Sequence, residues 1–305
     1  MNRRTLRVWL VGALACVLVA GLGGCEKGGA GAKTAETSKG HEITGRVVAV
    51  MADRGTLLVD HDEIPGYMPR MTMEFAVGPG DLALAKEGAE LRARLVEDGE
   101  GQFRLESVWW QDPLADVAVR KAADQLREDT AIRGRSAYRE VGENLPDFAL
   151  YDQNGQVVEA ARWRGKQIML NFIYTRCPVA TMCPLATAKM METQRLAKEA
   201  GVRNLELVSI TLDPEYDTPG VLREYAMTRG IDTSNFSFLT GPESAIKDLL
   251  KQFGVLSELE AGAQTEVPLI KHTLATLLID ERGKIAWRTD GSQWSPKVFV
   301  EKMAR

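Results

Sequence analysis

The 305-residue chain is short of the residues that form disulfides and bind metals. It contains four cysteines and three histidines, so its composition excludes both a disulfide-stapled scaffold and a histidine-rich metal tract. It also lacks an excess of charge of either sign: 38 lysines and arginines stand against 42 aspartates and glutamates, for a net charge of −4. Because nucleic-acid binding needs a basic surface, we expect no nucleic-acid partner.

A long membrane-spanning run is lacking as well. The apolar stretch at residues 8–20 is shorter than the ~20 residues that cross a bilayer, and it follows three arginines, Arg3, Arg4 and Arg7. A basic start, a short apolar run and small residues before a cysteine form the pattern of a secretory signal. The ending LGGC resembles a bacterial lipobox, which implies cleavage before Cys25 and a lipid on its thiol; an uncleaved membrane anchor is the alternative. In both cases we expect an exported protein, held at a bacterial membrane and facing the periplasm or another extracytoplasmic space.

These assignments leave Cys177 and Cys183 as the thiols of the exported body, because Cys16 lies in the signal and Cys25 would carry the lipid. A single nearby pair is too few for a disulfide framework. The pair can be a structural disulfide, a redox couple or a metal site.

Composition and periodicity divide the chain into segments. After the signal at 1–24, residues 25–40 are small and polar without an apolar period, which is typical of a flexible tether. Residues 41–111 look all-β, residues 112–140 carry apolar side chains at helical spacing and indicate a linker helix, and residues 141–305 alternate between strands and helices. We therefore expect two folded domains of different classes.

The first domain is predicted to be a small barrel. Turns that contain glycine, aspartate or proline separate its strands. Five short strands in so few residues suggest a closed, OB-like β-barrel, which leaves no exposed edge. The predicted strands are 43–50, 56–60, 71–77, 91–97 and 103–110.

The second domain is predicted to be an α/β sheet layered with helices, because strands and helices alternate along it. A hydrophobic strand leads to the cysteines, a helix follows, and a hairpin comes later, which is the thioredoxin-like order. The predicted strands are 168–175, 205–212 and 236–240, the hairpin strands are 273–279 and 284–288, and the helices are 184–200, 219–229, 244–253 and 296–304.

The barrel region contains an unusual group of sulfur-bearing residues. Met71 and Met73 alternate on a predicted strand, so both thioethers project from one face, and His61 and Met68 lie just upstream. Thioethers are soft ligands that suit Cu(I), and imidazole also binds copper, so the group favours monovalent copper or silver over zinc. Thioethers need no deprotonation, so such a site would tolerate mild acid. The alternative is that both methionines simply face the barrel core.

The segment IPGYMPRMTMEF at 64–75, which follows His61, resembles the CusF-like periplasmic copper-binding domain. The resemblance spans the barrel region and implies a five-stranded barrel that binds Cu(I) or Ag(I) through one histidine and two methionines, capped by a tryptophan ring. By position, it assigns the ligand roles to His61, Met71 and Met73. Met68 stands where the family has tryptophan, and it could serve as a further sulfur ligand instead of a cap.

A second group lies where a predicted strand ends and a helix begins. Cys177 and Cys183 occupy this junction, and Pro184 suits the first helical turn. A thiol near a helix N-terminus is favoured as thiolate by the positive end of the helix dipole. His272 precedes a later strand and, in a thioredoxin-like layout, lies across from this junction. A Cys/Cys/His set would fit trigonal Cu(I) and could also hold Cu(II); the third histidine, His41, shows no such context.

Five short segments and one histidine carry a second resemblance. They are LPDF at 145–148, YTRCP at 174–178, SITLDP at 209–214 with DTP at 217–219, and His272 ahead of LID at 278–280. By these segments, the second domain resembles the Sco/SenC family of copper chaperones. The resemblance implies a thioredoxin-like fold, copper ligands at Cys177, Cys183 and His272, and service to the dinuclear copper centre of cytochrome oxidase. Asp213 matches an acidic residue that the family has near the site, so the resemblance implies that it orients the site or contacts a partner.

The spacing of the cysteines departs from the family. Five residues separate Cys177 from Cys183, where the family has three, so the thiols must converge through a longer loop to chelate a metal. A turn could bring them within disulfide or chelation distance. The sequence therefore favours a metal site at Cys177 and Cys183, with a pair that only undergoes redox chemistry as the alternative.

The leading hypothesis is a metallochaperone that captures copper, holds it as Cu(I) and passes it to a respiratory copper protein such as a cytochrome oxidase subunit. The fusion of two sites suggests transfer from the barrel to the cysteines. One alternative is a thiol–disulfide oxidoreductase in which Cys177 and Cys183 reduce a copper-receiving partner, although the C-x-x-C spacing is missing. Another is a copper buffer for metal tolerance. Enzymatic activity is left open, with no catalytic residue beyond this redox pair.

Overall fold

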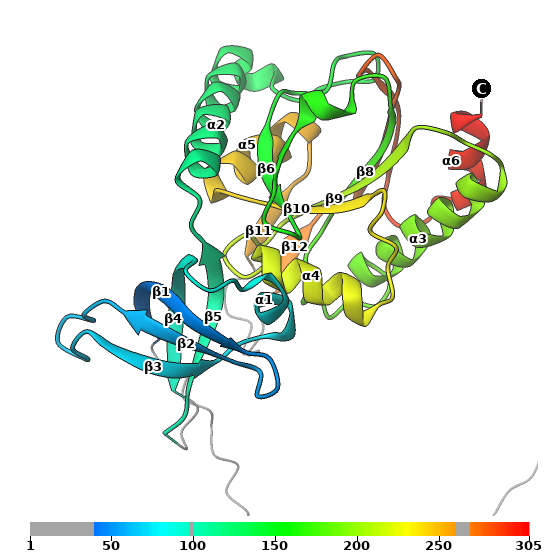
Figure 1. Ribbon diagram of the computed structural model, residues 1–305. Coiled ribbons are helices and arrows are strands. Elements are labelled where there is room, and N and C mark those ends of the chain that lie inside the picture. The colour runs from blue at the N-terminus through cyan, green and yellow to red at the C-terminus, as the bar shows by residue number, and fades with distance from the viewer. Residues whose placement is uncertain (1–39, 98–100, 260–268, 305) are drawn as a thin grey trace, which may run out of the picture. The chain divides into compact units, whose positions relative to one another are not determined.

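The computed structural model describes residues 40–97, 101–259 and 269–304, and Figure 1 shows their arrangement. The expected signal peptide, Cys25 and nearly all of the expected tether lie outside these residues. Within them, no helix is both long enough and apolar enough to cross a membrane.

The first domain is a closed barrel of strands in the order β1-β2-β3-β5-β4, which confirms the predicted five-stranded barrel (Figure 1). Side chains alternate along each strand, and Val59 of β2 and Phe75 of β3 point inward and are fully buried. A helix, α1, follows β3 and was not expected, because six residues are too few to show a helical period. The elements are β1 (His41–Met51), β2 (Thr56–His61), β3 (Met71–Ala76), α1 (Pro79–Leu84), β4 (Glu90–Glu97) and β5 (Phe103–Trp110).

The helix α2 (Pro113–Arg133) follows the barrel, where the apolar spacing predicted a helix. The Asp112 side chain caps its start by accepting hydrogen bonds from the backbone N–H groups of Leu114 and Ala115, at 3.0 and 3.2 Å. Its apolar face packs against α5 (Glu243–Phe253) of the second domain.

The second domain is built on a seven-stranded sheet in the order β14-β13-β8-β9-β10-β6-β7, which confirms the predicted thioredoxin-like α/β class. The central strands β8, β9 and β10 run parallel, and every residue of β9 and β10 is buried, as expected for strands covered on both faces. The strands β6 and β7 were not expected, because four and three residues are too few to show a period. The remaining elements are β6 (Ala149–Asp152), β7 (Val157–Glu159), β8 (Gln167–Ile173), α3 (Cys183–Glu199), β9 (Leu205–Thr211), α4 (Pro219–Thr228), β10 (Phe236–Thr240), β11 (Ser257–Leu259), β12 (Ile270–His272), β13 (Ala275–Ile279), β14 (Ile285–Asp290) and α6 (Pro296–Met303).

A small separate sheet, β11 with β12, corrects the expectation around His272. We expected a strand to begin at residue 273, but His272 is the last residue of β12, where it pairs with Ser257, and β13 begins at Ala275. Thr273 exchanges hydrogen bonds of 3.0 Å with the backbone of Leu256, which extends the pairing beyond Ser257 and His272. The histidine is therefore held by its own two-stranded sheet beside the central one.

The barrel packs on the second domain through α1 and α4, within one compact unit. Glycines let the two backbones touch: a Cβ on Gly80 would lie 1.9 Å from the carbonyl oxygen of Gly220. Beside this contact, burial raises the pKa of Asp81 to about 7, and the nearby Glu224 carboxylate adds to the shift. A side chain at either glycine would therefore separate the helices.

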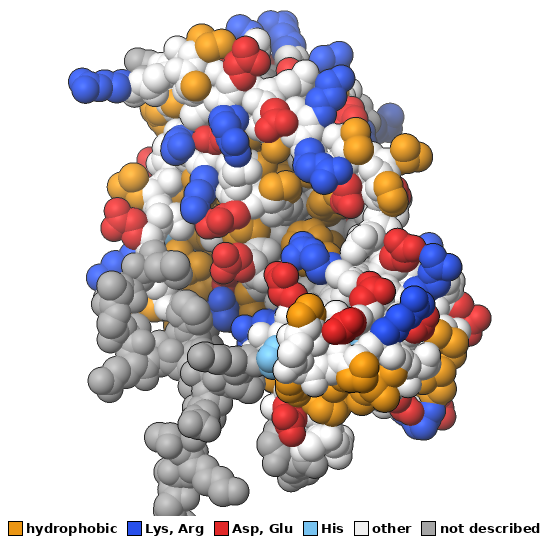
Figure 2. All heavy atoms as spheres, turned by 90° about the vertical axis from the view of Figure 1, so that its left-hand side faces the viewer, with side chains coloured by type: hydrophobic (Ala, Val, Ile, Leu, Met, Phe, Trp, Pro, Cys, Tyr) orange, Lys and Arg blue, Asp and Glu red, His pale blue; other side chains and the backbone are white. Residues whose placement is uncertain are grey.

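On the face drawn in Figure 2, the described acidic and basic side chains are interspersed, with small apolar areas between them. Exposed ion pairs occur in the barrel, such as Arg70 with Asp60 at 2.6 Å. Exposed pairs of this kind each contribute only about 0–1 kcal/mol to stability, so the fold rests on its buried apolar clusters.

Candidate metal centre

Both cysteines lie beyond the C-terminal end of β8, at the start of α3. Cys183 is the first residue of α3, one position earlier than predicted. The residues between the cysteines fold into turns: the backbone N–H of Cys177 donates to the Tyr174 carbonyl at 3.3 Å, and that of Met182 donates to the Val179 carbonyl at 3.0 Å. These turns fold the longer loop back, so the two sulfurs approach each other despite the five intervening residues.

The structure brings His272 to the same place. One ligand atom from each of Cys177, Cys183 and His272 lies within 4.8 Å of the others, and Nε2 of His272 is 3.4 Å from Sγ of Cys183. Nδ1 of His272 lies 3.2 Å from the carbonyl oxygen of Thr273, which can only accept, so Nδ1 carries a proton and Nε2 is the ring nitrogen that faces the sulfurs. Two thiols and one imidazole nitrogen thus converge from segments far apart in the chain.

The pKa values of the two thiols are shifted in opposite directions. A hydrogen bond from Cys183 lowers the pKa of the Cys177 thiol well below its ordinary value, and a hydrogen bond with His272 acts in the same direction. The same bond between the thiols, followed by burial, raises the pKa of Cys183. Both cysteines are free thiols and both are buried. The thiolate form is therefore favoured at Cys177, and a metal that bound both sulfurs would displace the proton of Cys183.

Asp213 contacts Arg176 rather than the ligand side chains. Its carboxylate accepts a hydrogen bond from Nε of Arg176 at 2.7 Å, and its backbone N–H donates to Oγ1 of Thr211 at 2.9 Å. Arg176 directly precedes Cys177 and stacks over the Tyr216 ring at 4.2 Å. Asp213 can therefore orient the cysteine loop through Arg176.

A second acid, Asp217, lies beneath the same loop and was missed as a site residue. It is fully buried, and its carboxylate accepts hydrogen bonds from the backbone N–H of Thr175 at 3.1 Å, from the Thr175 hydroxyl, and from the Thr211 hydroxyl at 2.5 Å. Burial raises its pKa to about 7, against the lowering effect of these bonds. The sequence shows Asp217 in the DTP segment, but nothing local indicates that its carboxylate turns inward.

The other predicted ligands lie at one end of the barrel. His61 ends β2 opposite Met71, the first residue of β3, and Met73 lies opposite Val59. Because side chains alternate along strands, His61 and both methionines share the face of the buried Val59. Met71 is exposed, whereas Met73 and Met68 are half-buried and pack against the barrel core. The structure therefore places the four predicted ligand residues at one barrel end.

His61 itself is fully buried, yet its Nε2 has no hydrogen-bond partner among the described residues. Its Nδ1 lies 2.7 Å from the carbonyl oxygen of Asp62, so Nδ1 carries the proton and Nε2 has a free lone pair. A buried polar atom without a partner costs about 1–3 kcal/mol. A soft ion held between this nitrogen and the thioethers would remove that cost, so the donor set fits monovalent copper or silver.

Gly45 of β1 lies opposite His61, and this gives a test of the barrel site. A Cβ at Gly45 would lie 2.7 Å from the carbonyl oxygen of Asp60 and 2.8 Å from Cα of His61. We expect Gly45→Val to push β2 outward, to destabilise the barrel by about 1–3 kcal/mol and to lower its Cu(I) affinity at least tenfold. Denaturant unfolding and chelator competition measure the two effects. Ala76→Val, at an exposed position of β3, should change neither; an unchanged affinity in the Gly45 variant would contradict the assignment of His61.

Two family models match the chain. The model described as "SCO1/SenC" matches residues 136–305, more than half of the chain, and the model described as "Copper binding periplasmic protein CusF" matches residues 40–109. The chain belongs to the SCO1/SenC family. Its barrel region is similar to CusF, as the methionine segment predicted.

Several relatives of this SCO1/SenC chain are known. The SCO2-like protein RC0895 of Rickettsia conorii is 34% identical over 139 residues, which are 45% of this chain and 65% of that protein. The SCO1 protein homolog of Bacillus subtilis is 28% identical over 151 residues, which are 49% of this chain and 75% of that protein. The crystal structure of a SCO1/SenC family lipoprotein from Bacillus anthracis str. Ames is 27% identical, with a TM-score of 0.48, and covers 55% of this chain and 98% of that one. The match thus spans less than two thirds of the Rickettsia protein.

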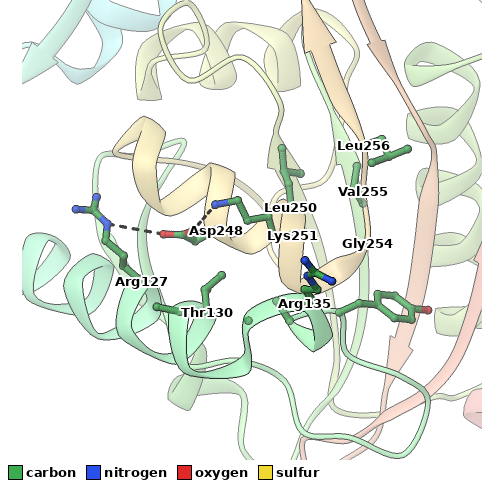
Figure 3. A pocket seen from close by; sticks show the side chains of 13 residues that line it. Arg127, Thr130, Arg135, Asp248, Leu250, Lys251, Gly254, Val255 and Leu256 are labelled. Atoms are coloured by element: carbon green, nitrogen blue, oxygen red, sulfur yellow. Dashed lines mark hydrogen bonds and ion pairs between the residues drawn. The ribbon is translucent and has the colours of Figure 1, made fainter.

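The chain also has a pocket of about 500 Å³ between α2 and α5 (Figure 3). Asp248 lies in its wall and pairs with Arg127 at 3.9 Å and with Lys251 at 3.2 Å. None of the predicted ligand residues line this pocket, and both cations are exposed. The pocket is therefore separate from the two ligand groups.

Proposed function

We propose that the chain is a membrane-tethered copper metallochaperone that binds Cu(I) and delivers it to a respiratory copper protein, with the dinuclear copper centre of cytochrome c oxidase as the receiving site. One observation carries the proposal: Cys177, Cys183 and His272 present three ligand atoms within 4.8 Å of one another on a SCO1/SenC domain. Copper is the cargo of this activity.

The donor set explains why Cu(I) suits the site. Two thiolate sulfurs and one imidazole nitrogen are soft to intermediate ligands, and three of them match the low coordination number that Cu(I) accepts. The same set could hold Cu(II) with added ligands. Because both cysteines are buried and His272 is half-buried, an incoming partner ligand would reach the ion from the histidine side. Release would then proceed by ligand exchange.

The barrel supports a second copper site in the same chain. His61 supplies an unpartnered buried nitrogen, and Met71, Met73 and Met68 supply thioethers that need no deprotonation. We propose that this site captures copper and passes it to the cysteines. An extracytoplasmic location is supported by the description of the matching barrel model as a periplasmic protein, and by the expected lipid on Cys25.

Copper transfer to a partner tests the proposal. The reduced full chain, loaded with Cu(I), is mixed with the metal-free soluble copper domain of a cytochrome oxidase subunit, and copper on each protein is measured after separation. We expect most of the copper on the partner, and little transfer from a Cys177→Ser/Cys183→Ser variant. If the metal-free chain instead reduces a partner disulfide while the loaded chain transfers no copper, the oxidoreductase alternative replaces the chaperone.

A further inference from the structure

His41 belongs to neither ligand group, yet it lies at the barrel end that carries one of them. Its ring stacks face to face on Tyr67, with centroids 3.9 Å apart and planes inclined by 14°. Among the residues that the structure describes, the His41 side chain forms no hydrogen bond. The stack is therefore what holds the His41 ring.

Tyr67 lies on a short turn that also carries Met68. Ile64 and Met68 exchange backbone hydrogen bonds of 2.8 and 3.0 Å, and the backbone N–H of Tyr67 donates to the Ile64 carbonyl at 3.0 Å. Gly66 supplies the positive φ, 73°, that this tight reversal needs. Because these bonds tie residues 64–68 together, the position of the Tyr67 ring also constrains the position of Met68.

The start of β1 runs beside this turn. Asp62, which follows β2, donates its backbone N–H to the Thr44 carbonyl at 2.9 Å and accepts a hydrogen bond from the Thr44 hydroxyl at 2.6 Å. The first residue of β1, His41, is thereby brought next to the turn that continues from β2. The stack thus joins the turn 64–68 to the first residue of β1.

We propose that His41 and Tyr67 are positioning residues of the barrel metal site: their stacked rings latch the turn 64–68 to β1 and keep the Met68 thioether beside His61. This inference rests on the proposed function, since it takes the barrel as a copper site. Unstacking frees the turn, withdraws one soft ligand and lets the ion leave. The latch therefore sets the rate of copper release, whereas His61 and the strand methionines set the identity of the ion.

The rate of Cu(I) release tests the latch. The full chain carries Cys16→Ser, Cys25→Ser, Cys177→Ser and Cys183→Ser, so that no thiol competes, and release to bicinchoninate is followed by stopped-flow absorbance. We expect His41→Ala and Tyr67→Ala each to speed release about fivefold, the factor that corresponds to about 1 kcal/mol for one aromatic stack. The double variant should be no faster than either single one, because both changes remove the same contact.

Conservative variants separate stacking from other roles. His41→Phe and Tyr67→Phe keep a flat ring and should release copper at the parent rate, and Tyr138→Ala, which removes an equally exposed ring elsewhere, should do the same. The parent here is the chain with the four cysteine changes and no other. Release from His41→Ala at the parent's rate, additive effects in the double variant, or fast release from His41→Phe would each overturn the latch. A parent that holds no Cu(I) would overturn the barrel site itself, whereas a parent that binds Cu(I) and is insensitive to these changes would overturn the latch alone.

Discussion

Replacing both cysteines of the SCO1/SenC domain should lower the Cu(I) stoichiometry of the chain from two tight equivalents to one. The expectation follows from two separate donor sets: the thiols that converge with His272, and the thioethers around the unpartnered nitrogen of His61. Serine is close to cysteine in size but is a hard, neutral ligand, so Cys177→Ser/Cys183→Ser should remove the first set and leave the fold. The measurement is an anaerobic titration of the reduced full chain, with Cys16→Ser and Cys25→Ser, against a competing Cu(I) chelator.

Reciprocal variants complete the titration. His61→Ala/Met71→Ala/Met73→Ala should also leave one equivalent, and combining it with the cysteine changes should leave none. Met227→Ala, at an exposed methionine outside both groups, should retain two equivalents. If the parent and the cysteine variant both bind one equivalent, the cysteine site is not a copper site, and the thiol pair is better explained as a redox couple.

Asp217→Asn should stabilise the protein at neutral pH and leave its stability at about pH 4 nearly unchanged. Burial raises the pKa of Asp217 from 3.8 in the unfolded chain to about 7 in the native one. Between these values the native state retains a proton that the unfolded state has lost, so the wild-type protein loses stability as pH rises from about 4 to 7. A rise in pKa from 3.8 to about 7 corresponds to a loss of stability on the order of 4 kcal/mol above pH 7, which asparagine removes.

Asparagine can keep the local geometry, because its oxygen can accept from Thr175 N–H and the Thr211 hydroxyl while its amide donates to the Thr175 hydroxyl. Denaturant unfolding from pH 4 to pH 8 measures the effect, with Asp53→Asn as an exposed control. Asp217→Ala should instead leave the N–H of Thr175 unpaired, loosen the loop before Cys177 and weaken Cu(I) binding at the cysteine site. Parallel stability–pH curves for wild type and Asp217→Asn would contradict the raised pKa.

The architecture followed from sequence patterns wherever the elements were long enough to show a period. Turns with glycine, aspartate or proline marked off the barrel strands, and the alternation of strands and helices marked β8, β9 and β10. Short elements were missed: α1, β6, β7 and the β11–β12 sheet are held by neighbours rather than by a pattern of their own. The strand expected to start at residue 273 was wrong for this reason: the three-residue strand β12, which pairs with β11, ends at His272, and β13 begins at Ala275.

The sequence by itself determined the chemistry that is available, since side-chain softness depends on residue type alone: two thiols, four thioether and imidazole candidates at 61–73, and one late histidine. Only the tertiary structure decided which of these groups meet. His272 contacts Cys183, 89 positions away in the chain, because the small sheet of β11 and β12 and the start of α3 lie at the same end of the central sheet. The inward turn of Asp217 and the stack of His41 on Tyr67 were likewise invisible in the sequence. Each depends on loop conformation and strand register, which long-range packing sets and local residues do not.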